Sequence, residues 1–334
     1  MNRSMILKIA AAACVVALTV CGTLIAGQAL GFGNRYADAD KYTAGGTALD
    51  GAVKNLDIHW TDGSVNIAYH SQNTVEISET ARKAISGDAA LRWWPDGDTL
   101  RIQYAKSGFT SLMSLEKSLT VTLPEGVALE SVAIDATSAD VNAPDLRAET
   151  VRVDLTSGDL RAALQGAKDV SAHSSSGTIE LDQTGAAERM ALDSTSGDIR
   201  AAVSDVGSMR VTATSGDIRV RLGNLDELSV STTSGSIAAE GGTVGKASLE
   251  STSGSIGVSL AAFDDLRIGA TSGDVTAALP TEPGYRADVD TTSGGFDYTV
   301  ALRREGGAYS CGDASAHLQI DTTSGDVLLQ DENE

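Results

Sequence analysis

Carboxylates recur at one site of a repeated turn, and they are the first residues in this sequence that could do chemistry. In six copies of a Thr-Ser-Gly-Asp pattern, an Asp follows the turn glycine or the alanine that replaces it. If the copies stack, neighbouring carboxylates lie about 5 Å apart, the spacing of adjacent strands. The column could bridge divalent cations, or each Asp could cap its own turn. These residues are Asp140, Asp159, Asp198, Asp217, Asp274 and Asp326.

Turn capping is the interpretation that we favour, because the sequence lacks the nine-residue Gly/Asp pattern of calcium-binding solenoids. Outward-facing acids also show no focused cluster beside a cleft-forming loop. The histidines are scattered, without the paired spacing of a metal site. We therefore predict no catalytic residue, no metal and no cofactor. The four histidines are His59, His70, His173 and His317.

Three aromatic residues are the candidates for ligand contact. Trp93 and Trp94 precede a Pro-Asp-Gly turn, and Tyr104 ends the next expected strand. Together they could form a flat platform for a sugar or for peptidoglycan. In the alternative interpretation, one tryptophan faces the core and the other packs on a hairpin, since aromatic rings bury large areas.

Repeats of about 19 residues would position these side chains. From Ala139 onward the turn positions follow at intervals of 19, 19, 20, 19, 19, 19, 19, 21 and 31 residues. A fixed period of this length indicates stacked units that cannot bury their apolar faces alone. Glycine supplies a turn backbone with φ above zero, which costs other residues roughly 1–2 kcal/mol. The structural turn glycines are Gly63, Gly158, Gly177, Gly197, Gly216, Gly235, Gly254, Gly273, Gly294 and Gly325.

Apolar and polar residues alternate on both sides of each turn, and this period of two predicts strand, turn, strand with one buried face. Crossovers between parallel strands are right-handed. We therefore predict an all-β fold: a single-stranded, right-handed parallel β-solenoid (β-helix) with coils of about 19 residues, preceded by one transmembrane helix. Around Gly216 the apolar positions are Met209, Val211, Ala213, Ile218, Val220 and Leu222.

Composition limits the possible partners. The chain has 334 residues, 25 of them basic and 45 acidic, for a formal charge of −20. This charge disfavours nucleic acid as a partner, because phosphate backbones bind basic surfaces. Three cysteines are too few for a disulfide framework. Cys311 is the one outside the apolar N-terminal stretch, and it could pair between chains if it were exposed.

The N-terminal segment has the features of a membrane anchor. Residues 9–32 carry no charge, which is long enough to span a bilayer. Basic residues before this run, Arg3 and Lys8, favour a single-pass protein of the cell membrane with its C-terminal domain extracytoplasmic. Two alternatives are a cleaved signal peptide, which would give a secreted protein, and a lipoprotein signal.

Five segments follow from these patterns. Residues 1–32 form the anchor or signal, and residues 33–51 a polar linker. Irregular coils occupy 52–130, because Gly63 lies 76 residues before Ala139, which is four periods of 19. Regular coils occupy 131–330, and an acidic tail, 331–334, guards the last strand edge.

The repeated turns, the strand Leu119–Leu123 before Pro124 and the N-terminal apolar segment resemble the bacterial "putative adhesin" family of uncharacterised β-solenoid domains. The resemblance covers roughly residues 50–330 and implies a surface-exposed solenoid without agreed catalytic residues. We therefore expect a non-enzymatic, membrane-anchored extracytoplasmic module that binds a cell-surface or envelope protein or glycan. The alternative is a polysaccharide lyase or hydrolase built on a β-helix.

Overall fold

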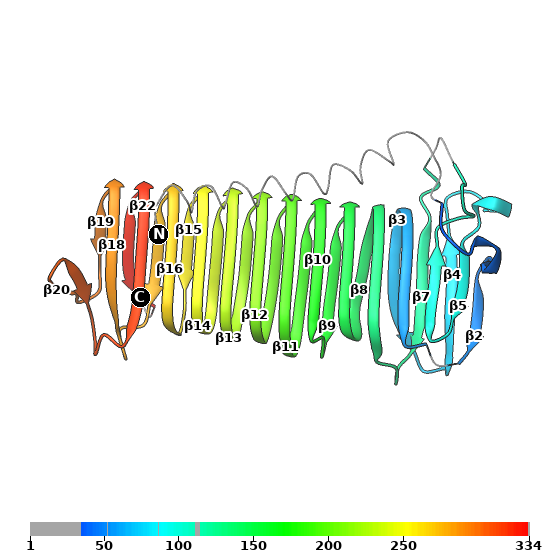
Figure 1. The fold of residues 1–334 in the computed structure, drawn as a ribbon, viewed down its shortest axis with the longest axis horizontal. Helices are drawn as coiled ribbons and strands as arrows, with labels where there is room; N and C mark the ends of the chain where they lie inside the picture. The colour runs from blue at the N-terminus through cyan, green and yellow to red at the C-terminus, as the bar shows by residue number, and fades with distance from the viewer. Residues whose placement is uncertain (1–34, 52, 86, 111–113, 333–334) are drawn as a thin grey trace.

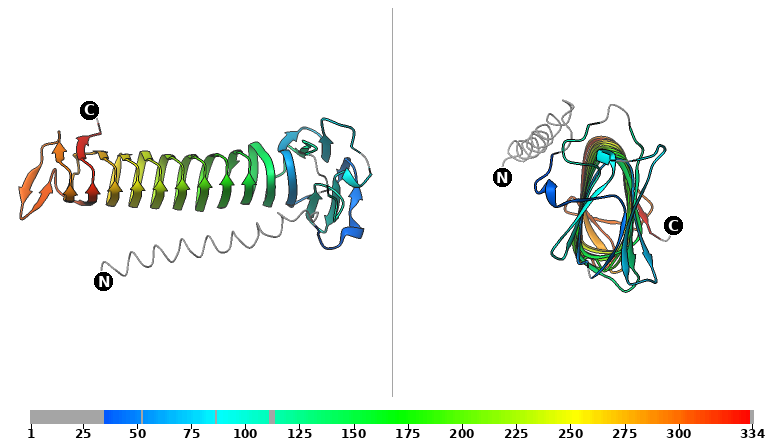
Figure 2. Two further views of the ribbon diagram at one scale, coloured as in Figure 1. Left: turned by 90° about the horizontal axis from the view of Figure 1, so that it is seen from above. Right: turned by 90° about the vertical axis from the view of Figure 1, so that its right-hand side faces the viewer.

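The computed structural model describes residues 35–51, 53–85, 87–110 and 114–332. In this part of the chain, 23 strands stack into one elongated rod (Figure 1). Seen along the rod, the coils superimpose as flattened loops around a thin core (Figure 2). The all-β, parallel stacked fold expected from the repeats is confirmed, whereas the right-handed winding stays a prediction.

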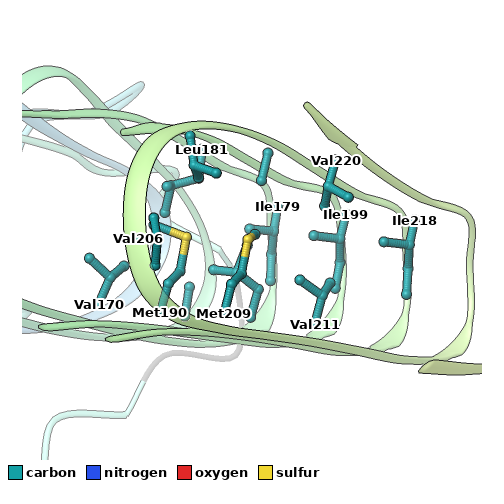
Figure 3. Packing of buried hydrophobic residues seen from close by; sticks show 14 of the residues in the cluster. Val170, Ile179, Leu181, Met190, Ile199, Val206, Met209, Val211, Ile218 and Val220 are labelled. Atoms are coloured by element: carbon teal, nitrogen blue, oxygen red, sulfur yellow. The ribbon is translucent and has the colours of Figure 1, made fainter. Parts of the chain in front are cut away.

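In the middle of the rod, β11 to β14 are each one long strand that bends around the core and returns on the opposite side, whereas the coils on either side are divided between β9 and β10 and between β15 and β16. Between β12 and β13 the paired residues lie 19 positions apart, as in Val211 with Val230. Figure 3 shows Ile179, Ile199 and Ile218 in a row, with methionines facing them from the other arm. The central strands are β8 (Leu129–Ser157), β9 (Leu160–Gln165), β10 (Asp169–Ser176), β11 (Ile179–Ser196), β12 (Ile199–Ser215), β13 (Ile218–Ser234), β14 (Ile237–Ser253), β15 (Ile256–Ser259), β16 (Ala262–Ser272) and β17 (Val275–Leu279).

The turn glycines stack in a column, and close approach is the main reason for glycine there. A Cβ built on Gly216 would lie 2.2 Å from the carbonyl oxygen of Gly197, a distance that no side chain tolerates. Gly158 and Gly177 also have the positive φ expected from the sequence, 131° and 135°. Gly216 lies outside that region, so at this turn the stacking distance, and not φ, requires glycine.

The irregular coils expected over residues 52–130 are not stacked between the coil of Gly63 and the regular coils. Strand β3 pairs in parallel directly with β8, so that Gly63 lies opposite Ala139. The other edge of β3 pairs with β6 and β7, which come later in the sequence. The 76-residue interval is therefore an excursion that builds the N-terminal end of the rod. Its elements are β3 (Asn55–His70), β4 (Thr74–Thr80), η2 (Gly87–Ala89), β5 (Arg92–Asp96), β6 (Thr99–Gln103) and β7 (Ser118–Pro124).

Antiparallel strands cover that end, and they include residues that the sequence assigned to a linker. Strand β4 pairs with β7, and β5 pairs with β6. Outside them, β2 pairs with β4 and β1 pairs with β5. The former linker thus contributes η1 (Ala39–Lys41), β1 (Thr43–Ala44) and β2 (Thr47–Asp50) to the cap.

The C-terminal coil is also displaced from its sequence order. Strands β22 and β23 lie between the coil of β16 and β17 and the coil of β18 and β19. Accordingly, Gly325 stacks on Gly273, and Gly294 stacks on Gly325. The rod therefore ends at β18 and β19, and the acidic tail expected to guard the last edge follows an inner coil. These strands are β18 (Tyr285–Ser293), β19 (Phe296–Tyr298), β20 (Arg303–Glu305), β21 (Ala308–Ser310), β22 (Ala316–Ser324) and β23 (Val327–Asp331).

None of the helices within the described residues is long and apolar enough to cross a membrane. The predicted transmembrane segment, residues 9–32, lies outside the described residues.

Candidate binding surface

The turn aspartates form a ladder that joins consecutive coils. The Oδ1 atom of Asp198 accepts a hydrogen bond of 3.1 Å from the backbone N–H of Asp217, which in turn accepts one of 2.8 Å from Ser236 N–H. All six turn aspartates bond the next coil in this way, and not their own turn as the sequence suggested. No group of three or more potential metal ligands occurs in the described part of the chain.

Ion pairs on the flat faces of the rod are solvent-exposed. Arg161 and Arg200 contact the turn aspartates of their own coils, Asp159 and Asp198, at 3.0 and 2.7 Å. Both arginine side chains are about half exposed, at 55% and 44%. Exposed pairs of this kind contribute at most about 1 kcal/mol. The charged side chains on these faces are therefore solvated, and their ion pairs add little to the stability of the rod.

Two histidines bridge carboxylates near the ends of the rod. His59 contacts Asp57 at 3.1 Å and Asp135 of the adjacent coil at 3.2 Å. The hydrogen bond to Asp57 raises the pKa of His59, although partial burial opposes the rise. At the other end, His317 lies 3.6 Å from Asp265 and 3.3 Å from Asp288. Each of these histidines belongs to a coil that is out of sequence order, β3 or β22.

The N-terminal end holds a buried polar cluster that the sequence did not indicate. Lys117 is fully buried, and its Nζ lies 2.6 Å from Oε2 of Glu79. The ammonium group also sits over the rings of Trp60 and Tyr104, 5.1 and 4.3 Å from their centroids. Burial lowers the pKa of Lys117, against the opposing effect of Glu79. This cluster closes the core beneath the antiparallel strands.

The structure does not unite the three aromatic candidates in one platform. Tyr104 is 8% exposed, and its hydroxyl donates to Asp62. Trp93 packs against the hydrophobic core, because adjacent residues of a strand point to opposite faces. Only Trp94 turns outward, where it is half-buried.

Trp94 belongs instead to a different aromatic group at the N-terminal cap. Its ring meets Tyr42 edge-on, with centroids 5.7 Å apart, and Tyr42 meets Tyr36 at 4.8 Å. Lys41 lies over the indole at 4.6 Å, and Arg101 lies at 6.0 Å. Tyr36 and Tyr42 were not among the predicted ligand contacts, because residues 33–51 were expected to form a polar linker.

The C-terminal tip carries a second aromatic group. Phe296 lies 5.5 Å from Tyr298 and 4.9 Å from Tyr309, measured between ring centroids. Among the large hydrophobic side chains of the described residues, that of Tyr298 is exposed, with 46% of its surface accessible to solvent. Phe296 and Tyr298 fill inward positions that hold aliphatic residues in the regular coils. This change from aliphatic to aromatic residues is the feature of the sequence that could have identified the outermost coil.

An open cleft of about 430 Å³ lies beside this group. Thr281, Thr299, Val300 and Asp331 contribute to its walls, and Thr281 donates a 3.0 Å hydrogen bond to Asp331. Cys311 borders the cleft but is 5% exposed, and burial raises the pKa of its thiol. The thiol is therefore shielded, and intermolecular pairing is disfavoured.

These features define a parallel β-solenoid repeat protein with two chemically different ends. The chain belongs to the Toastrack DUF4097 family, whose model matches residues 53–240 and 204–330. This confirms the family-level resemblance drawn from the repeated turns. No curated protein that was compared matches the chain.

Several solved structures are similar in outline. One is described as a putative cell adhesion protein from Clostridium sporogenes, with 12% identity, a TM-score of 0.21, and coverage of 87% of this chain and 100% of that chain. Another, a putative adhesin from Bacteroides fragilis, shows 11% identity, a TM-score of 0.31, and coverage of 85% and 96%. A third, a putative lipid binding protein from Parabacteroides distasonis, shows 10% identity, a TM-score of 0.36, and coverage of 85% of this chain and 95% of that chain. TM-scores this low assign no ligand or role to this chain.

Proposed function

We propose that this chain is a non-enzymatic, membrane-anchored extracytoplasmic solenoid that binds a cell-surface or envelope protein or glycan. One observation carries the proposal: the side chains capable of chemistry are engaged in holding coils together. The turn aspartates bond neighbouring backbones, the Lys117 ammonium pairs with Glu79, and the His59 imidazole bridges two carboxylates. Such a surface suits recognition by a rigid scaffold better than proton or group transfer.

The arrangement of the ends supports an outward-pointing rod. The described chain enters at the N-terminal cap, where Tyr36 donates to Ala105 across 3.0 Å. If residues 9–32 lie in the bilayer, this cap faces the membrane and the C-terminal tip points away. Ten regular coils would place the tip roughly 50 Å farther out, at about 4.8 Å per strand. We retain right-handed winding as part of this proposal.

Labelling from outside the cell tests the placement. Arg219 faces solvent in the middle of the rod, so Arg219→Cys provides an exposed thiol with little cost to stability. With Cys14 and Cys21 replaced by serine in both chains, a membrane-impermeant maleimide should label the variant in intact cells but leave its parent unlabelled, because Cys311 is buried. If labelling required cell lysis, the rod would lie on the inner side of the cell membrane, and the proposal would be rejected.

Binding to envelope material tests the role. The purified full chain in detergent micelles should sediment with envelopes from cells that lack it. Trp94→Ala is the variant that asks whether the outward indole contacts a glycan there, with Trp93→Phe as the core-facing control. Release of reducing or unsaturated sugars from envelope polysaccharides would instead support the alternative, a lyase or hydrolase.

A further inference from the structure

The C-terminal tip ends in strand edges that are open in the described structure. Strand β19 pairs with β23 on one side, and within the described residues no strand lies on its other side. Strand β18 pairs with β22 on its inner side, and on its outer side with β21 only at Arg286 and Ala287. Beyond that short contact, no strand of the described residues pairs with the outer backbone edge as far as the end of β19, at one extremity of the rod (Figure 1), while the ring of Tyr309 lies against Phe296 and Tyr298.

The hydrogen bonds to the inner coil show which backbone groups face outward. Thr299 N–H donates to Leu329, and the carbonyl of Gly295 accepts from Val327, both at 2.9 Å. In a parallel pair, alternate residues direct both polar groups to the same neighbour, so Phe296 and Tyr298 direct theirs to the open side. Main-chain donors and acceptors on an open edge are a template for an added strand.

The opposite end presents no parallel coil edge for head-to-tail stacking of copies, since its outermost strands within the described residues, β1 and β2, are antiparallel and only two and four residues long. There the parallel edges of β6 and β7 are already paired with the antiparallel strands β5 and β4. A second copy could join only tip to tip, which would bring like charges together. The segment 287–302 carries Asp288, Asp290 and Asp297 and is flanked by Arg286 and Arg303, and the whole chain has a formal charge of −20.

The side chains around the edge describe the partner that fits. Asp290 and Asp297 call for basic residues on one face of an added strand, whereas Asp288 already pairs with Arg286 and His317. The partly buried Val289 and Phe296 call for apolar residues on the other face, since successive side chains alternate. The acidic cleft at the end of β19, which Glu282 helps to line, can take a further basic side chain.

We propose that the tip binds an extended segment of a partner protein, with basic and apolar residues alternating, which adds as a strand to the open edge of β18 and β19. This inference rests on the proposed binding function and names its partner class. Main-chain hydrogen bonds would supply the affinity, and the aspartates would select the sequence.

Two synthetic peptides of alternating Lys-Val and Glu-Val residues, added to the full chain in micelles, test the proposal by fluorescence anisotropy. Only the Lys-Val peptide should bind. Amide hydrogen exchange should slow at Phe296 and Tyr298 when it does, because their N–H groups become bonded. Tyr298→Pro removes one outward donor without touching the bonds to β23, and it should abolish binding.

A matched charge pair separates the edge from general electrostatics. Asp290→Lys at the tip should weaken binding roughly tenfold, about 1.4 kcal/mol, whereas Asp226→Lys, exposed on a central coil, should change it by less than twofold. Equal binding of both peptides, equal effects of the two substitutions, or unchanged exchange at the tip would overturn the inference. If envelope sedimentation persists in that case, only the partner class is wrong and the proposed function stands.

Discussion

The two ends of the rod are finished differently. At the N-terminal end, antiparallel strands cover the last parallel coil, and the buried Lys117–Glu79 pair fills the space beneath them. At the C-terminal end, three aromatic rings cover the core, Tyr298 is 46% exposed, and the outer backbone edge is largely open. One end is therefore built as a plug, whereas the other leaves groups available to a partner.

The two ends also share one feature. At each end, the first or last coil in the sequence is not the outermost coil of the rod, because another coil packs outside it. The coil of β3 lies inside that of β6 and β7, and the coil of β22 and β23 lies inside that of β18 and β19. A terminal coil cannot fray on its own when another coil covers it. Both ends have a coil inserted out of sequence order. The difference in exposure between them therefore comes from what lies outside the last parallel coil: antiparallel strands at the N-terminal end, and a largely open edge at the C-terminal end.

The largest expected effect tests the plug. Glu79→Ala leaves the Lys117 ammonium buried without its carboxylate, which should cost about 3–5 kcal/mol. Denaturant unfolding followed by tryptophan fluorescence reports this, since all three tryptophans lie in the N-terminal region. The control is Glu149→Ala, which breaks an exposed pair with Lys168 and should cost less than about 0.5 kcal/mol. Similar losses in both variants would show that the buried pair does not close this end.

The next effect compares the middle of the rod with its tip. A Cβ would lie 2.2 Å from a carbonyl oxygen at Gly216 and 2.0 Å away at Gly294, and neither glycine has φ in the left-handed region. Gly216→Val should therefore cost about 1–3 kcal/mol from overpacking. Gly294→Val should cost less, because the outermost coil can move outward. Thermal melting followed by circular dichroism measures both, and a larger loss at Gly294 would mean that the tip is held as rigidly as the middle.

The smallest effect depends on pH. The pKa of His59 is raised in the folded state, so its contribution to stability is fully present below about pH 6.5 and is lost as pH rises through the folded value. His59→Gln should lower stability at pH 5.5 by less than about 1 kcal/mol, because solvent screens this partly exposed group, and by less still at pH 8.5. His317→Gln, whose carboxylate contacts are longer, is the comparison at the other end. Melting temperatures of the parent chain and the variants at the two pH values measure these effects. If the loss of stability in His59→Gln were larger at pH 8.5 than at pH 5.5, the raised pKa of His59 would be contradicted.

Much of the central rod could be predicted from the sequence, and much of its ends could not. Alternation around Gly216 gave the buried positions, because a strand with one covered face needs apolar residues at every second place. The role of Asp217 was assigned to the right group, the backbone N–H, but to the wrong coil. Spacing along one chain cannot show which of two stacked turns lies nearer to a carboxylate.

The candidate surface was predicted only in part. Trp94 faces outward as a ligand contact would require, but Trp93 and Tyr104 turn toward the core. The partners of Tyr104 come from a distant segment: its hydroxyl donates to Asp62 and its ring meets Trp60, which lie 42 and 44 positions earlier in the chain. No local pattern records such a contact.

The sequence by itself determined the repeating coil, because period, alternation and turn residues act between neighbours that are about 19 positions apart along the chain. Tertiary structure alone decided the order of the end coils. Any coil with the same turn and the same apolar spacing can pair with any other, so Gly325 fits on Gly273 as well as Gly294 would have. The choice depends on which arrangement covers the end of the core, and that is a property of the assembled rod.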